Sequence, residues 1–288
     1  MLYMPASNPR AIDKARGLDA DALMFDLEDA VAPEAKPGAR DTLLAELGAG
    51  GFGHRRLIAR INALSTPWGE ADLAALAQAP VEALLVPKVD DAADIVALSV
   101  AMDHAGYNPA VALWVMIETP CAVLALDRIA ACAATTRLAG MVLGLNDLAK
   151  DSGMAQLPGR AAFQPVLTMA VLAARAHGLF VLDGVCNAID DLARLEAETV
   201  QARDGGFDGK TLIHPAQIAT VNHVFAPSEA ELAEAQAIVD AFADPANAGR
   251  GALRVAGKMA ERLHLVQAER LIARATSIAN RSGAPATS

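Results

Sequence analysis

The chain has 288 residues, of which 53% are hydrophobic and 20% are charged, and its formal net charge is −10 at pH 7. This length can bury a large core, either in one α/β barrel or in two smaller domains. The negative charge argues against a nucleic-acid groove and against an anionic membrane surface, because both would repel the protein.

The sequence also shows no apolar run long enough to span a bilayer and no N-terminal pattern of a secretory signal. Its three cysteines, Cys121, Cys132 and Cys186, have neither CxxC nor metal-site spacing. We interpret them as small core residues in a reducing compartment. These features predict a cytoplasmic protein.

Apolar runs of strand length alternate with helical segments along most of the chain. Strands are expected at residues 2–5, 22–28, 56–62, 83–89, 112–118, 139–145, 179–185 and 209–214. The first helix is expected to follow an N-cap at Ser7 or Asn8 and to end at Gly17. Further helices are expected at residues 37–47, 68–79, 90–105, 120–134, 163–177, 188–204, 215–224 and 228–243.

The predicted strands are continuous apolar runs, which is typical of parallel strands covered on both faces. Eight such units in a chain of this length predict an α/β fold of the TIM (β/α)8 barrel type. A doubly wound sheet is the structural alternative, but no GxGxxG follows the first strand.

The C-terminal part of the chain lies outside the eight units. Residues 244–251 form a linker rich in Pro, Gly and Asn, and residues 259–279 are expected to form one helix. We therefore predict a barrel core at 1–226 and a C-terminal helical extension at 227–288. This extension is expected to pack on its own barrel or to contact a neighbouring subunit.

Charged or polar residues lie at or just after the ends of seven of the predicted strands. In a TIM barrel, function collects at the C-terminal ends of the strands. Residues of this kind at those ends are Asp26, Glu28, Asp29, Arg60, Asn62, Lys88, Glu118, Asp147, Asp183 and His214. Strands must end in something polar, but seven such endings together indicate a site.

The stretch at residues 24–31 is the most acidic of these strand ends. Alternate residues of a strand share a face, so Asp26 and Glu28 are expected to point the same way. Two neighbouring carboxylates need a cation, a metal or a shared proton. The alternative is a strand that runs into an exposed acidic turn.

Glu118 and Asp147 are the best candidates for metal ligands, because they end neighbouring strands of the predicted barrel. Two protein carboxylates with water and substrate oxygens are a usual way of holding Mg²⁺. The sequence has no cluster of His and Cys of the kind that binds zinc. The alternative is that Glu118 caps the next helix and Asp147 ends a turn.

Arg60 lies inside an apolar strand, so its charge needs an anion. That anion is either Glu28 or a substrate carboxylate or carbonyl bound by the guanidinium. Lys88 is either a Schiff-base lysine or an ion-pair partner, and we favour the second. We expect His214 to order the last loop.

Several segments, in order along the chain, resemble the citrate lyase beta-chain family within the HpcH/HpaI aldolase superfamily, which includes malyl-CoA and citramalyl-CoA lyases. The clearest are Asp-Leu-Glu-Asp-Ala-Val at 26–31 and Gly-Leu-Asn-Asp-Leu at 144–148. The others are residues 2–10, Lys36 with Ala39 and Arg40, and residues 60–62, 87–88, 117–119, 206–217 and 257–259. The resemblance covers essentially the whole chain.

The resemblance implies a TIM barrel that cleaves or forms a C–C bond in a 3-hydroxyacyl thioester. It implies that Glu118 and Asp147 hold Mg²⁺, which chelates the keto acid, and that Arg60 stabilises charge on the carbonyl oxygen. Glu28 and Asp29 would order metal-bound water and the thioester arm. Further candidate contacts to substrate or CoA are Lys14, Asn62, Pro87, Lys88, Asp183 and His214.

In the family's CoA lyases, the C-terminal segment reaches a neighbouring subunit and supplies an acid in the motif Gly-x-Met-Ile-Asp. This implies a homo-oligomer, a trimer by resemblance. Here the motif reads Gly-Lys-Met-Ala-Glu at 257–261, so Glu261 replaces Asp as the general acid/base. Ala6 and Ala122 stand where glycine is common, which alters the expected substrate pocket.

The leading hypothesis is thus a Mg²⁺-dependent carbon–carbon lyase that splits a short 3-hydroxyacyl-CoA into acyl-CoA and a 2-keto acid. Hydrolysis of the same thioester is a nearby variant. The alternatives are a metal-dependent aldolase on free hydroxy-keto acids and a non-catalytic barrel that binds a ligand.

Overall fold

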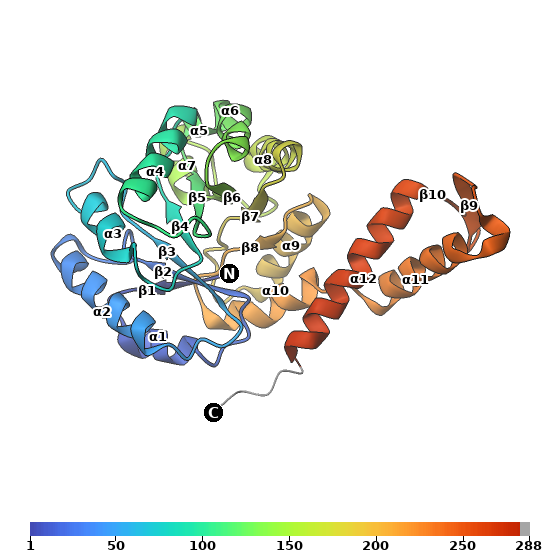
Figure 1. The fold of residues 1–288 in the computed structure, drawn as a ribbon, viewed down its shortest axis with the longest axis horizontal. Helices are drawn as coiled ribbons and strands as arrows, with labels where there is room; N and C mark the ends of the chain where they lie inside the picture. The colour runs from blue at the N-terminus through green and yellow to red at the C-terminus, as the bar shows by residue number, and fades with distance from the viewer. Residues whose placement is uncertain (283–288) are drawn as a thin grey trace. The chain divides into compact units, whose positions relative to one another are not determined.

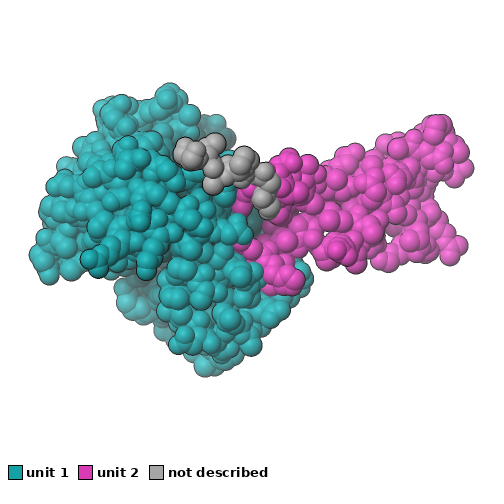
Figure 2. Space-filling model, turned by 90° about the horizontal axis from the view of Figure 1, so that it is seen from below, with its two compact units in different colours: residues 1–221 teal, residues 222–288 magenta. Residues whose placement is uncertain are grey.

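The structure is a computed structural model that describes residues 1–282. It has two compact units, residues 1–221 and the chain from residue 222 onward (Figure 2). The predicted division into domains at 1–226 and 227–288 stays a prediction.

The first unit contains eight parallel strands in one sheet, ordered β1 to β8 along the chain (Figure 1). A parallel bridge between Leu2 and Leu212 joins the first strand to the segment after the last. Backbone hydrogen bonds from Tyr3 N to Leu212 O and from Leu212 N to Met1 O, both 2.8 Å, continue this closure. The predicted TIM barrel is therefore confirmed. Its strands are β1 (Leu2–Pro5), β2 (Ala22–Asp26), β3 (Arg56–Arg60), β4 (Ala83–Val86), β5 (Ala112–Ile117), β6 (Leu138–Leu143), β7 (Phe180–Asp183) and β8 (Gly209–Lys210).

Helices separate the strands and surround the sheet in Figure 1. Their starts follow the expected capping chemistry: Asn8 Oδ1 accepts from Ala11 N in α1, and Asp91 forms a capping box with Asp94 in α4. The helices of this part of the chain are α1 (Pro9–Ala15), α2 (Lys36–Ala49), α3 (Gly69–Leu76), α4 (Ala92–His104), α5 (Pro120–Leu124), α6 (Leu126–Ala131), α7 (Leu145–Ser152), α8 (Gln164–His177), α9 (Leu192–Asp204) and α10 (Ile218–Phe225).

The predicted boundaries differ from the structure at several places. The helix predicted at 120–134 is two short helices, α5 and α6, followed by a 3-10 turn. Helix α7 was not predicted, and Asp147 lies in its first turn rather than at a strand end. The strand predicted at 209–214 is only the two residues of β8.

The barrel interior is apolar below its C-terminal end. Alternate strand residues point inward, and a buried cluster includes Met24, Ile58, Leu85, Met116 and Val142. At the other end, Trp114 stacks on Phe180 with ring centroids 6.4 Å apart. A Cβ at Gly140 would lie 2.8 Å from the Trp114 ring, so the ring needs glycine there. These apolar layers lie below the C-terminal mouth, where Arg60 and Glu118 are placed.

The second unit contains a helix, a hairpin and a second helix: α11 (Glu229–Ala243), β9 (Ala252–Val255), β10 (Lys258–Glu261) and α12 (Arg262–Ser282). The prediction of one helix over 259–279 was wrong at its start, because residues 259–261 pair with β9. Ala256 and Gly257, both with positive φ, form the tight turn that permits this pairing.

Cys132 and Cys186 are buried as expected, but Cys121 is exposed on α5. Among the described residues, no helix is long and apolar enough to cross a membrane.

Candidate active site

Arg60 stands at the C-terminal end of β3, directly opposite Asp26 of β2 in the register of the sheet. Its Nε donates to Asp26 Oδ1 at 2.7 Å and its Nη2 to Oδ2 at 2.5 Å. Burial disfavours the guanidinium charge, but Asp26, through its charge and hydrogen bonds, raises the pKa of Arg60 well above its usual value. The sequence suggested Glu28 as the internal partner, whereas Asp26 makes the two-point pair. A charged donor is thus fixed at the barrel mouth.

Glu28 and Asp29 lie on the other side of the same guanidinium. Arg60 Nη1 is 2.7 Å from Glu28 Oε2 and 3.3 Å from Asp29 Oδ2. The Glu28 contact is an ion pair without hydrogen-bond alignment, since its buried Oε2 has no hydrogen-bond partner among the described residues. Burial, then the charges of Asp29, Glu118 and Asp26, raise the pKa of Glu28 to about 8, against the opposing effect of Arg60. Glu28 can therefore exchange a proton near neutral pH.

Glu118 is fully buried just beyond the end of β5. Its Oε1 accepts a hydrogen bond from Lys88 N at 2.8 Å, while its Oε2 is buried without a hydrogen-bond partner in the described part of the chain. Burial raises the pKa of Glu118 above its ordinary value, although the charge of Lys88 opposes this. A buried carboxylate oxygen without a hydrogen-bond partner raises the free energy of the folded state unless a ligand binds to it.

Gly144, at the N-cap of α7, makes room for this carboxylate. A Cβ at residue 144 would lie 2.5 Å from Glu118 Cβ and 2.7 Å from Glu118 Oε2. Glycine at this position therefore sets the position of the Glu118 side chain.

Asp147 faces the same place from the first turn of α7. Lys88 Nζ lies 2.6 Å from Asp147 Oδ1 and 3.3 Å from Glu118 Oε1, so one ammonium contacts both carboxylates. Lys150 Nζ is 3.1 Å from the same Asp147 oxygen. Burial would raise the pKa of Asp147, but the hydrogen bonds and charges of the two lysines hold it below its ordinary value. Lys88 is thus an ion-pair partner, as we favoured.

Glu118 and Asp147 fit a hard divalent cation. Both supply carboxylate oxygens at one place, one oxygen is buried and unpartnered, and Gly144 keeps the space open. No group of three or more His, Cys, Asp or Glu suited to a metal occurs in the part of the chain that the structure describes. A cation here would take its other ligands from water and substrate, as Mg²⁺ does.

Two residues of this mouth were not singled out from their chemistry. Tyr3 lies inside the barrel under Arg60, with the guanidinium carbon 5.0 Å from its ring centroid. Burial raises the pKa of Tyr3 above its usual range. Lys36 is buried, and its Nζ donates to Leu27 O, Glu28 O and Asn62 Oδ1 within 3.0 Å. The inward alternation of β1 was the available signal for Tyr3, whereas nothing local marked Lys36.

The remaining predicted contacts lie in two kinds of place. Asn62 and Asp183 are buried and bound to protein groups: Asn62 Nδ2 donates to Leu27 O and Asp72, and Asp183 pairs with Arg160 and Lys210. Their polar atoms already have protein partners, which favours a structural role, and the expected ligand contact stays a prediction. The others are Lys14 and His214, which are exposed, and Pro87, which is buried before Lys88.

His214 accepts from Ala216 N through Nδ1 at 3.2 Å, which agrees with the expected role in ordering the last loop. Glu261 lies on β10 in the second unit, where its N–H donates to His264 Nδ1 at 2.9 Å. The catalytic role expected for Glu261 stays a prediction.

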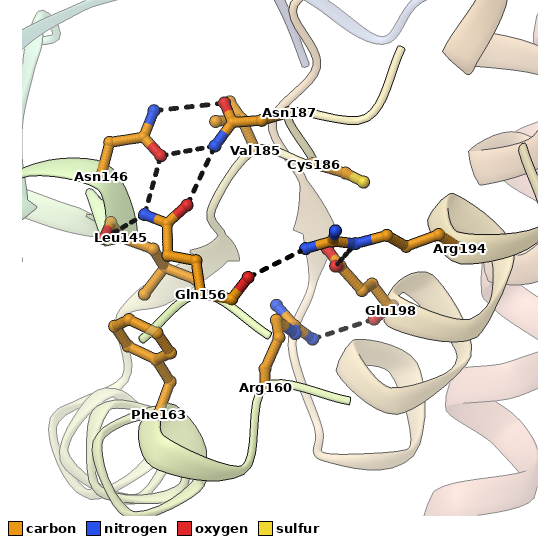
Figure 3. A pocket seen from close by; sticks show the side chains of 10 residues that line it. All are labelled: Leu145, Asn146, Gln156, Arg160, Phe163, Val185, Cys186, Asn187, Arg194 and Glu198. Atoms are coloured by element: carbon orange, nitrogen blue, oxygen red, sulfur yellow. Dashed lines mark hydrogen bonds and ion pairs between the residues drawn. The ribbon is translucent and has the colours of Figure 1, made fainter. Parts of the chain in front are cut away.

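A small polar hollow opens at the start of α7, where Leu145 and Asn146 line it together with Gln156 and Asn187 (Figure 3). In Figure 3 the amides of Asn146, Gln156 and Asn187 hydrogen-bond to one another, and Arg194 pairs with Glu198 at 2.9 Å. The side chains of this wall thus satisfy one another and hold the start of α7 in place.

The sequence matches the model of the HpcH/HpaI aldolase/citrate lyase family over residues 1–215. A (3S)-malyl-CoA thioesterase of Cereibacter sphaeroides is 48% identical over 279 residues, which cover 97% of this chain and 95% of that protein. An L-malyl-CoA/beta-methylmalyl-CoA lyase of Rhodobacter capsulatus is 32% identical and covers 95% of this chain and 93% of its own length.

Among solved structures, protein CitE from Mycobacterium tuberculosis in complex with magnesium, acetoacetate and coenzyme A matches with a TM-score of 0.78 at 30% identity. The match covers 96% of this chain and 97% of CitE. The chain belongs to the HpcH/HpaI aldolase/citrate lyase family of enzymes.

Proposed function

We propose that the protein hydrolyses the thioester of a short 3-hydroxyacyl-CoA, with malyl-CoA as the first candidate, and that Glu118 and Asp147 hold the Mg²⁺ this requires. The observation that carries the proposal is the pair of facing carboxylates with the unpartnered Oε2 of Glu118, beside the fixed guanidinium of Arg60. The choice of hydrolysis over C–C cleavage is supported by the 48% identity to a (3S)-malyl-CoA thioesterase.

When bound, Mg²⁺ would polarise a substrate oxygen and stabilise negative charge on it. Arg60, which Asp26 holds in one orientation, would donate to the thioester carbonyl oxygen as charge develops there. Glu28, whose pKa is about 8, would take the proton of the attacking water. Water oxygen bonds to the carbonyl carbon, the C–S bond breaks, and the proton goes to the leaving thiolate. The products are the free hydroxy acid and CoA.

Carbon–carbon cleavage is the second candidate, and the 32% identity to a malyl-CoA lyase favours it. The same two carboxylates and Arg60 suit a chelated 2-keto acid. In this reaction Glu261 would act as the acid/base that exchanges a proton with the acyl-CoA carbon. The relatives named above that act on CoA thioesters support either candidate over an aldolase on free acids.

We also propose a homotrimer in which Glu261 reaches the barrel of a neighbouring subunit. The support is that Glu261 lies in the second compact unit, near apolar side chains that the chain leaves exposed. Met259 is 70% exposed, Leu263 54% and Val266 46%. A second copy would cover them. Because CoA thioesters are intracellular metabolites, this function also agrees with the expected cytoplasmic location.

The test is turnover of a panel of 3-hydroxyacyl-CoAs with Mg²⁺ and with EDTA, measuring free thiol and 2-keto acid separately. Thiol release without keto acid supports hydrolysis, and keto acid without free thiol supports the lyase. Failure of every thioester to react would overturn both candidates.

A further inference from the structure

Lys88 occupies an unusual position for a surface lysine. Its Nζ lies between Asp147 Oδ1 at 2.6 Å and Glu118 Oε1 at 3.3 Å, and its side chain is 36% exposed. Its ammonium thus contacts both carboxylates that would hold a metal, yet it retains an open path to solvent.

The backbone holds Lys88 in this place. Its φ is 54°, in the left-handed region that disfavours a residue with a side chain. The strain is accompanied by the hydrogen bond from Lys88 N to Glu118 Oε1. This backbone hydrogen bond keeps the main chain of Lys88 next to Glu118 even when the Lys88 ammonium moves away.

Two other lysines provide a contrast. Lys210 also lies between carboxylates, but it is fully buried and has no path to leave Asp183. Lys150 contacts Asp147 at 3.1 Å, is 68% exposed and does not contact Glu118. Only Lys88 among the three is both bridging and able to swing outward.

We propose that Lys88 is a built-in counter-ion: its ammonium neutralises Glu118 and Asp147 in the metal-free protein, and Mg²⁺ displaces it into solvent on binding. This inference rests on the metal site of the proposed function. A dication and an ammonium cannot share the same two carboxylates without strong repulsion. Mg²⁺ affinity is therefore set partly by the ion pairs that Lys88 must give up.

The first test is isothermal titration of Mg²⁺ into the purified, EDTA-treated protein and into Lys88→Met, with Lys150→Met as the matched control. Without the competing ammonium, Lys88→Met should bind Mg²⁺ about tenfold more tightly, because charge-assisted hydrogen bonds of this kind are lost on displacement. Lys150→Met, which removes the same charge from one carboxylate only, should change the affinity by about threefold or less. Equal Mg²⁺ affinities of the wild type and Lys88→Met would overturn the role of Lys88 but leave the proposed metal site standing. Absence of Mg²⁺ binding to the wild type would overturn the metal site as well.

A second measurement separates displacement from mere repulsion. In EDTA, Lys88→Met should unfold at a lower temperature than the wild type, because the buried Glu118 then lacks a counter-ion. Mg²⁺ should raise the unfolding temperature of Lys88→Met by more than it raises that of the wild type. In crystals of the wild type grown with Mg²⁺, Lys88 Nζ should lie beyond hydrogen-bond distance of Asp147. A bound Mg²⁺ with Lys88 still on Asp147 would contradict displacement.

Discussion

Arg60 and Asp26 face each other across β3 and β2 and share two parallel hydrogen bonds, of 2.7 and 2.5 Å. This fork-to-fork geometry fixes the plane of the guanidinium, which a single contact would not do. One edge of Arg60 is therefore committed to the scaffold, and Nη1 remains on the side of Glu28 and Asp29. The pair turns a strand-end arginine into an oriented donor.

Replacement of Arg60 by lysine should reduce kcat/KM by about 10²-fold or more, because lysine keeps the charge but lacks the planar fork. Steady-state thiol release with Mg²⁺ present measures this. Arg56→Lys is the control, since Arg56 is exposed and pairs with the exposed Glu82. Wild-type kcat/KM in Arg60→Lys would show that the orientation of the guanidinium is not used.

Replacement of Gly144 by alanine should displace Glu118, because the new Cβ would overlap its side chain. We expect a loss of about 1–3 kcal/mol in the free energy of unfolding, typical of overpacking, together with weaker Mg²⁺ binding. Urea unfolding and titration calorimetry measure the two effects. Gly38→Ala is the control, because a Cβ at residue 38 of α2 meets no atom within 4 Å. Unchanged Mg²⁺ affinity in Gly144→Ala would separate Glu118 from the metal.

Glu28 should make the metal-free protein less stable as the pH rises. Its folded pKa of about 8 lies above the ordinary value of 4.5, so between these values the folded state holds a proton that the unfolded state has released. The free energy of unfolding must then fall with rising pH across this window and level off above about 8. Glu28→Gln cannot titrate, so it should gain stability relative to the wild type over the same range. Thermal unfolding in EDTA from pH 5 to 9 measures this, with the exposed Glu34→Gln as control. A constant difference between wild type and Glu28→Gln would contradict the raised pKa.

Glu261 should be needed for carbon–carbon cleavage, the second candidate reaction, but not for Mg²⁺ binding. Measured as release of the 2-keto acid, kcat should fall by about 10²-fold in Glu261→Gln, the usual contribution of a positioned acid/base, whereas Glu261→Asp should retain this activity. Glu269→Gln, on an exposed position of α12, is the control.

If Glu261 acts on a neighbouring subunit, co-expression of Glu261→Gln with Glu118→Gln chains should restore part of the activity. Some sites in the mixed oligomers would then combine an intact barrel with an intact second unit. No recovery in mixed oligomers, with each variant inactive alone, would place Glu261 outside a shared site.

The sequence predicted the barrel well because buried parallel strands need continuous apolar residues. In β4 all four residues are buried, and the pattern contains no competing helical period. The predicted strands ran too far because Leu27, Ile61 and Val89 are apolar and buried just beyond the strands. An apolar pattern indicates burial, and buried loop residues give the same pattern as buried strand residues.

The hairpin of the second unit was missed for a different reason. Lys-Met-Ala-Glu at 258–261 consists of good helix formers, and its strand conformation depends on pairing with β9. The turn needs a positive φ at Ala256 and Gly257, and of these two residues only the glycine indicates a turn in the sequence. Local residue preferences do not predict pairing with another strand of this kind.

In the candidate site, the sequence predicted residue types at strand ends but not their pairings. Arg60 pairs mainly with Asp26 because of the β2–β3 register, and Lys88 joins Glu118 to Asp147 because α7 starts immediately after β6. Side-chain directions at loop positions decide such contacts, and they follow from the tertiary structure alone.

The most direct test of the central claim is release of CoA thiol from malyl-CoA by the wild type and by Glu118→Gln, across a Mg²⁺ titration and in EDTA. We predict wild-type turnover that rises with Mg²⁺ and vanishes in EDTA, and no turnover by Glu118→Gln at any Mg²⁺ concentration, with its circular dichroism unchanged. EDTA-resistant turnover by the wild type, or wild-type turnover by Glu118→Gln, would contradict metal-dependent chemistry at Glu118 and Asp147.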